Sequence, residues 1–192
     1  YAGAKQRVAA LAKALSSADK GRPLVNLSEN SMEAALVQLA AMAQGIPIAT
    51  LTPDLGTDAG KNVQLQEFLA ALKPQIVFAA DAKQFAPGLT AAQGQNAKSW
   101  VAIADKRMPA GTTSLEDVMR PGAGADMPSM PNSLDAARIQ FAGDAASPND
   151  GYVTTFAMRT AFQSGLAQLW PFLSATPPVL LDRIPWHHPV GA

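Results

Sequence analysis

Residues 24–51 read LVNLSENSMEAALVQLAAMAQGIPIATL, and this stretch decides the fold class. Leu24 to Leu27 is an apolar run of the length of a buried strand, and Ile46 to Leu51 is a second one. Between them, Asn30 followed by Glu33 has the form of a helix N-terminal cap, and Gly45 has the position of a helix stop. The stretch therefore predicts a strand, a helix and a second strand. The apolar residues expected on the inward face of the helix are Met32, Leu36, Leu39 and Met42.

The alternation of strand and helix patterns continues along the chain. Apolar residues recur every three or four positions from Ala2 to Leu15 and from Lys61 to Leu72, which indicates helices. Strands that alternate with helices favour a parallel sheet, because right-handed crossovers place the helices on its faces. We therefore expect an α/β fold with a doubly wound, mostly parallel sheet and helices on both faces. The remaining expected elements are strands at 76–79, 100–104, 139–142 and 179–184, and a helical stretch at about 153–173.

One lobe is the simplest organisation of residues 1–192. A chain of 192 residues buries a core of its own and fits within a single domain. Residues 120–133 are rich in Pro, Gly, Met and Ser, which indicates a surface loop inside the lobe; a domain linker is the alternative. Because the chain opens at Tyr1 within a helical pattern, we expect it to be a piece of a longer protein.

Composition argues against several classes of function. Fifteen basic residues balance fifteen acidic ones without a long run of either sign, so nucleic acid is not an expected partner. Cysteine is absent, which excludes disulfides, thiolate catalysis and cysteine-ligated metals. No secretory leader pattern and no run of membrane-spanning length is present, so a soluble, cytoplasmic protein is expected. His187 and His188 have no acidic partner at ligand spacing, and no metal site is expected.

The stretch FAGDAASPNDGYV, from Phe141 to Val153, has the layout of a phosphate loop without its chemical groups. It resembles, without a gap, the phenylalanine-led T-S-G-S-T-G-x-P-K-G loop of the AMP-forming acyl-CoA synthetases. In that superfamily the loop's small residues, hydroxyls and lysine hold the triphosphate of ATP. Here the loop keeps Gly151, while two glycines become Asp144 and Ser147 and the lysine aligns with Asp150. The hydroxyl positions fall on Ala142, Gly143, Ala145 and Ala146.

The loop has thus lost donors and gained two anions. A carboxylate about 4 Å from a phosphate charge costs roughly 1 kcal/mol at the dielectric of water and about 4 kcal/mol at an effective value of 20. We expect weak or absent ATP binding by this loop unless Mg²⁺ bridges the acids. Taken alone, the stretch fits an ordinary surface turn better than a working phosphate site.

Three further segments carry the same resemblance along most of the chain. Residues 22–30 (RPLVNLSEN), 45–49 (GIPIA, with Pro53 after it) and 72–81 (LKPQIVFAAD) are similar to early motifs of the superfamily. Residues 177–188, PPVLLDRIPWHH, resemble most closely the P-P-V-L-V-D-W-L-P-W-N-H of the feruloyl-CoA synthetase branch. The resemblance implies part of the large N-terminal domain of an acid-CoA ligase.

With Mg²⁺ present, such a ligase joins a carboxylic acid to the AMP part of ATP and releases pyrophosphate. It then passes the acyl group to coenzyme A. The resemblance implies an aromatic acid as substrate, with Trp186 as a wall of the acyl pocket and His188 beside it. His187 replaces the family's Asn. The alternative is that Trp186 packs in the core and both histidines are solvated or hydrogen bonded.

Later adenylate motifs, the hinge and the C-terminal domain of the family are missing from these residues, so the isolated chain is expected to be inactive. Whether it is itself an enzyme stays open at this point. The competing hypothesis is a non-catalytic binding or homo-oligomerisation module that kept the ligase fold and uses an apolar face. A truncated or decayed reading frame is a third.

Overall fold

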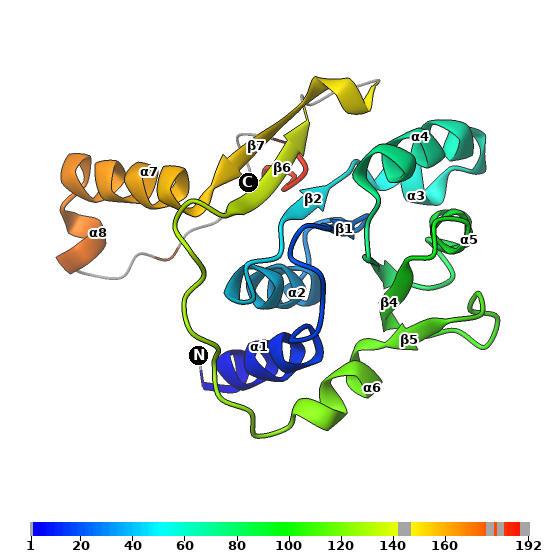
Figure 1. Ribbon diagram of the computed structural model, residues 1–192, viewed down its shortest axis with the longest axis horizontal. Coiled ribbons are helices and arrows are strands. Elements are labelled where there is room, and N and C mark those ends of the chain that lie inside the picture. Colours follow the sequence, from blue (N-terminus) through cyan, green and yellow to red (C-terminus); the bar gives the residue numbers. More distant parts are fainter. Residues whose placement is uncertain (1, 142–146, 176–178, 180–182, 189–192) are drawn as a thin grey trace.

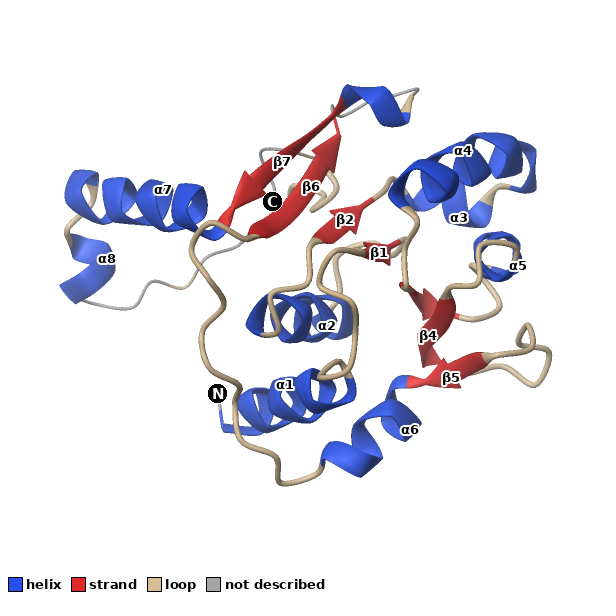
Figure 2. Ribbon diagram, in the orientation of Figure 1, coloured by secondary structure: helices blue, strands red, loops and turns tan. Residues whose placement is uncertain are grey.

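The computed structural model describes residues 2–141, 147–175, 179 and 183–188. Within these ranges, no helix combines the length and apolar character that crossing a membrane requires. A seven-stranded sheet in the order β5-β4-β3-β1-β2-β6-β7 organises the described chain (Figures 1 and 2). Its strands are β1 (Leu24–Asn26), β2 (Ile48–Thr50), β3 (Ile76–Asp81), β4 (Lys98–Ile103), β5 (Thr112–Ser114), β6 (Ala136–Phe141) and β7 (Gly151–Thr155).

The strand pairs from β5 across to β6 are parallel, and only the edge strand β7 is antiparallel to its described neighbour β6. Strand β1 lies between β2 and β3, with Leu24 level with both Ile48 and Ile76. This register brings the residues that follow the three central strands to one edge of the sheet. The expected α/β fold with a mostly parallel sheet is confirmed.

Helices cover both faces of the sheet (Figures 1 and 2). On one face lie α1 (Ala2–Ala14), α2 (Met32–Ala43) and α6 (Leu115–Met119); on the other lie α3 (Pro53–Thr57), α4 (Asn62–Leu72) and α5 (Ala86–Gln93). Successive strand residues point to opposite faces, so Leu24 joins the core under α1 and α2, whereas Val25 joins the core under α4 and α5. The short 3₁₀ helices are η1 (Ala59–Lys61), η2 (Arg120–Gly122) and η3 (Pro148–Asp150).

The helix after β1 begins one residue later than predicted. Its N-cap is Ser31, whose Oγ accepts a hydrogen bond from the backbone N–H of Ala34 at 3.0 Å. The prediction of Met32 and Leu39 on the inward face is wrong, because 63% and 51% of these residues are exposed. Leu36 is buried as predicted, and alanines share the inward face with it. The buried residues of α2 are Ala34, Leu36, Val37, Ala40 and Ala41.

The helical stretch predicted from Val153 begins later as well. Val153 lies in strand β7, and α7 (Phe156–Leu169) starts behind an N-cap at Thr155, whose Oγ1 accepts from the N–H of Met158 at 3.3 Å. A short helix α8 (Phe172–Ala175) follows. The predicted strand at 179–184 lies partly outside the described residues, and its described positions, 179, 183 and 184, are not in a strand.

Helices α3 and α5 cross so closely that both contribute a glycine. A Cβ on Gly88 would lie 2.8 Å from Gly56 Cα and 2.9 Å from Leu27 Cδ1. We predict that Gly88→Ala lowers the free energy of unfolding by about 1–3 kcal/mol, because backbone atoms must move apart. Urea denaturation measures the change. The matched control is Gly165→Ala in α7, where a Cβ meets nothing within 4 Å and helix propensity favours alanine. Equal stability of the two variants would contradict the close crossing.

Candidate functional site

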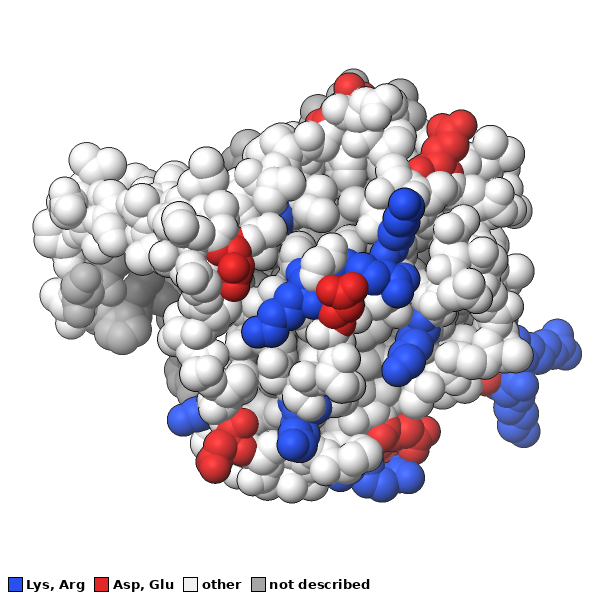
Figure 3. All heavy atoms as spheres, viewed as in Figure 1, with Lys and Arg blue, Asp and Glu red and all other residues white. Residues whose placement is uncertain are grey.

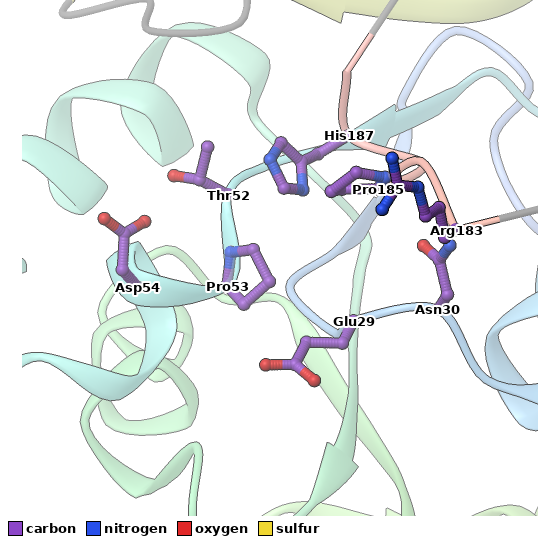
Figure 4. A pocket seen from close by; sticks show the side chains of 8 residues that line it. All are labelled: Glu29, Asn30, Thr52, Pro53, Asp54, Arg183, Pro185 and His187. Carbon is purple, nitrogen blue, oxygen red and sulfur yellow. The ribbon is translucent and has the colours of Figure 1, made fainter. Parts of the chain in front are cut away.

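A cavity of about 540 Å³ lies at the carboxyl ends of β1 and β2. Glu29 and Asn30 come from the turn after β1, and Thr52, Pro53 and Asp54 from the turn after β2. The third wall is a segment far along the chain, which contributes Arg183, Pro185 and His187. Figure 4 shows His187 and Glu29 on opposite sides of Pro53. In open parallel sheets, crevices outside the carboxyl ends of strands are the usual ligand sites.

Hydrogen bonds attach the segment 183–188 to the sheet. The side chain of Asn30 donates through Nδ2 to the carbonyl of Ile184 at 2.9 Å and accepts through Oδ1 from the N–H of Trp186 at 2.8 Å. Arg138 Nη2 donates to the carbonyl of Trp186 at 3.0 Å. The N–H of His188 donates to the carbonyl of Pro185 at 3.0 Å, which closes a turn with His187 near its tip. The segment therefore forms a lid over the end of the sheet.

Arg138 is a buried cation on β6. Only 7% of the residue is exposed, and burial lowers the pKa of its guanidinium to about 10, with the charge of Arg159 acting in the same direction. The group therefore stays protonated at neutral pH. It makes longer contacts to Gln38 Oε1 at 3.4 Å and Thr50 Oγ1 at 3.5 Å, and no described carboxylate forms an ion pair with it. Neutral oxygens, chiefly the Trp186 carbonyl, are its described partners.

Charges on the other side of the cavity are partly balanced. Asp54 forms an ion pair with Lys61, the last residue of η1. Burial acts to raise the pKa of Asp54, but hydrogen bonds from Lys61 and Thr52 and the Lys61 charge together hold that pKa below its usual value. Asp54 is therefore ionised at neutral pH, and its charge is offset by Lys61.

His187 is the histidine of the lid that lines the cavity. Burial lowers its pKa, the neighbouring His188 lowers it further, and the carboxylate of Asp54 opposes the shift. At neutral pH the imidazole is therefore uncharged. An uncharged imidazole offers one donor, one acceptor and a flat apolar face to a ligand.

The described residues of the expected phosphate loop do not line this cavity. Its residues Ala142, Gly143, Asp144, Ala145 and Ala146 lie outside the described part of the chain. Of the described ones, Ser147 caps η3 by accepting from the N–H of Asn149 at 3.2 Å, and Asp150 is exposed at the end of η3. Ser147, Asp150 and Gly151 are not among the residues that line the cavity.

This loop does not lead directly into the helix predicted at about 153–173. It joins two antiparallel strands, β6 and β7, and α7 begins only at the far end of β7. The partial positive charge of a long helix N-terminus is therefore missing from the loop. Gly151 has a packing role instead, because a Cβ there would lie 2.6 Å from Cε1 of Phe141. Phe141 itself packs edge-on against Phe68 at a centroid distance of 5.0 Å.

The three residues expected at an acyl pocket separate within the lid. His187 lines the cavity, whereas Trp186 packs against the core under α1 and α2. His188 is half-buried and is not a lining residue of the cavity. Sequence reasoning did not single out Glu29, Thr52 or Asp54. Their signal was position, since each follows closely on a predicted strand whose carboxyl end faces the crevice. Among the described residues, no group of three or more His, Asp or Glu side chains is arranged to hold a metal ion.

No protein-family model and no curated protein matches the sequence. Solved structures do match the fold, and ATP-bound MatB from Rhodopseudomonas palustris superposes with a TM-score of 0.78 at 22% identity over 100% of this chain and 36% of that one. The fold of this chain therefore corresponds to part of the fold of MatB. A benzoate CoA ligase from Burkholderia xenovorans LB400 matches with a TM-score of 0.65 at 16% identity, over 89% of this chain and 31% of that one.

The anthranilate CoA ligase AuaEII, in complex with anthranoyl-AMP, matches with a TM-score of 0.65 at 14% identity, over 87% of this chain and 30% of that one. At these identities the likeness is one of fold. The chain spans about a third of the length of each of the three proteins.

We predict that His187 titrates below the usual histidine value of about 6.5. As the pH falls below about 6.5, the unfolded chain takes up a proton on this residue before the folded chain does. The free energy of unfolding should therefore decrease with falling pH until the folded pKa is passed. Imidazole NMR titration measures the pKa, and urea unfolding at several pH values, compared with His187→Gln, measures the linked change. A folded pKa at or above 6.5 would contradict the burial.

Proposed function

We propose that this chain forms the acid-binding part of the N-terminal domain of an AMP-forming carboxylic acid-CoA ligase similar to feruloyl-CoA synthetase. The observation that carries the proposal is the lid. Residues 183–188, the end of the segment that resembles the feruloyl-CoA synthetase branch, lie over β1 and β2 and wall a cavity of about 540 Å³. That volume suits a small organic ligand. The fold likeness to benzoate and anthranilate CoA ligases supports an aromatic acid as the substrate class.

The lining of the cavity suits a flat, anionic ligand. Pro53, Pro185 and the uncharged ring of His187 offer apolar surface to an aromatic ring. Arg183 offers a guanidinium to the carboxylate, and such a pair is the stronger, charge-assisted kind. Because Lys61 offsets Asp54, Glu29 is the acid that remains to repel a carboxylate. We therefore propose that the acid binds with its carboxylate toward Arg183 and away from Glu29.

The described residues of the loop do not fit a triphosphate. The Ser147 hydroxyl already accepts from Asn149, Asp150 adds a negative charge, and no long helix begins at this turn. In the parent reaction ATP supplies the AMP that activates the acid, and coenzyme A takes the acyl group. For this chain we propose acid binding alone, because the described residues of this loop do not offer the groups that hold a triphosphate.

An aromatic acid such as ferulate is expected to bind the chain weakly. A ligand of about 14 non-hydrogen atoms at about 0.3 kcal/mol each gives a Kd of about 1 mM. Ligand-observed NMR and calorimetry measure it. Arg183→Gln should weaken binding about tenfold, since it removes a charged hydrogen bond worth about 1.5 kcal/mol. Arg107→Gln, outside the cavity lining, is the matched control. Equal binding by the Arg183 and Arg107 variants would sink the proposed orientation, and no binding of any aryl acid would sink the function.

Mg-ATP is expected to bind the chain without micromolar affinity. Calorimetry on the wild-type chain tests this, and Asp150→Lys should bind more tightly than wild type. The substitution changes the interaction with a phosphate about 4 Å away by about 2 kcal/mol even at the dielectric of water. A micromolar Kd of the wild-type chain for Mg-ATP would contradict the proposal that this loop has lost its phosphate-binding function.

A second candidate function, an oligomerisation module, is favoured by helix α7. No residue of α7 is buried, and Met158, Phe162 and Leu169 form an exposed apolar stripe along it. Its one charged residue is Arg159, and the surface over α7 is free of charged side chains in the view of Figure 3. A second copy of the chain could therefore pair there without repulsion between like charges.

Light scattering separates the two candidates. A dimer that Phe162→Glu dissociates, combined with no binding of aromatic acids, would favour the module. The matched control is Met130→Glu, at an exposed position in the loop before β6. A monomer that binds the acid would favour the ligase part.

A further inference from the structure

The side chain of Asn30 acts on a segment more than 150 positions away. A primary amide has one donor side and one acceptor side, and Asn30 uses both on the lid: Nδ2 donates to the Ile184 carbonyl and Oδ1 accepts from the Trp186 N–H. This is the pattern in which a neighbouring strand would bind residues i and i+2. Asn30 is itself fixed, because the next residue, Ser31, caps α2. Asn30 therefore holds the lid in a fixed position relative to the start of α2.

Arg138, on strand β6, also binds the backbone of Trp186. The Trp186 N–H is bound by Asn30 and its carbonyl by Arg138, so both backbone polar groups of Trp186 are engaged. The carbonyl at 3.0 Å is the nearest acceptor of this buried guanidinium, ahead of Gln38 and Thr50. Lifting the lid would leave a buried cation with two long contacts to neutral groups, which is costly.

The face of the sheet beneath the lid changes from apolar to polar at this level. Leu24 and Ile48 belong to the core under α1 and α2, but two residues later on the same face stand Asn26 and Thr50, which pair in register. Trp186 adds the apolar anchor by packing against that core. The polar residues Asn26 and Thr50 thus lie on the face of the sheet that the polar backbone of the lid approaches. The side chain of Trp186 sets how deeply the lid packs against the core.

His187 follows directly on the residue held in this way. The turn from Pro185 to His188 closes on its own backbone hydrogen bond, so fixing Trp186 fixes the direction of the His187 side chain as well. Figure 4 shows that side chain beside Thr52 and Pro53, at the cavity. The position of one cavity wall therefore depends on Arg138, which is not a lining residue of the cavity, and on Asn30, which itself lines it.

We infer that Asn30 and Arg138 are positioning residues, which hold the lid so that His187 forms a wall of the cavity, and that the affinity of the cavity for its ligand depends on them. Their action on the lid does not depend on which ligand binds. The effect on affinity rests on the proposed function, since an aromatic acid is the probe.

The experiment compares Asn30→Ala and Arg138→Met with two matched controls. Asn132→Ala removes an asparagine that also bonds loop backbone, at the N–H of Leu134, and Arg22→Met removes an arginine that also donates to carbonyls, those of Lys73 and Pro74. Imidazole NMR without ligand reports on the lid, because the chain has two histidines. The Kd for ferulate reports on the cavity.

In Asn30→Ala we expect the pKa of His187 to rise toward the usual value as its burial is lost, although the Asp54 and His188 contributions weaken too. Ferulate binding should weaken by about tenfold or more, since a displaced wall no longer matches the ligand. The two controls should leave both readouts at wild-type values. Asn30 is exposed, so its variants stay usable should Arg138→Met fail to fold.

Two outcomes separate this inference from the proposed function. Wild-type binding of ferulate together with an unchanged His187 titration and Kd in Asn30→Ala would overturn the positioning role and leave the function intact. No ferulate binding by wild type, with a raised His187 pKa in Asn30→Ala but not in Asn132→Ala, would overturn the function and support the hold on the lid.

Discussion

The in-register pairing of β1 with β2 and β3 is the constraint on which the rest of the structure depends. Leu24, Ile48 and Ile76 stand level, so the chain leaves all three strands at the same edge of the sheet. Because the strands are parallel and covered by helices on both faces, polar groups gather where the strands end. The turns after β1 and β2 and the lid meet at that edge, and the candidate site is a consequence of this register.

A single buried charge links the sheet to the lid. Arg138 is paired with Ile48 in the ladder and points to the face under α2, where its described partners are neutral oxygens. Burying a guanidinium without a carboxylate is unfavourable unless carbonyls replace the lost water. The Trp186 carbonyl meets part of this need, which explains why an irregular segment lies against the sheet. Asn30 supplies the complementary bonds from the other side.

The loop at 141–153 resembles a phosphate loop in spacing, but its polar residues do not suit phosphate binding. Phe141 and Gly151 are retained, and the structure gives both a packing reason, since the glycine leaves room for a ring that packs on Phe68. The groups that would hold a phosphate are replaced, and the described turn joins two strands instead of leading into a helix. The spacing of Phe141 and Gly151 is therefore consistent with a packing requirement of the fold. The identity of the polar residues in the loop determines whether it can bind a phosphate.

The sequence by itself determined the fold class and the strands β1, β2, β3, β4 and β6 with the helices α1, α2 and α4. It did not predict β5, β7, α3, α5 or α6. The predicted apolar period of α4 is Val63, Leu65, Phe68, Leu69 and Leu72. Of these, Leu65, Phe68 and Leu69 are buried, because a helix on a sheet must present one apolar stripe, whereas 72% of Val63 is exposed. Local signals failed where two patterns compete, as at residues 151–155, where β-branched residues in GYVTT form a strand at the start of a predicted helix. Only the tertiary structure decided that Asn30 binds the lid instead of capping α2, that Trp186 packs inward, and that His187 faces the cavity. Contacts between residues more than 150 positions apart are set by the register of the sheet and by the burial of Arg138, and neither leaves a periodic trace in the sequence.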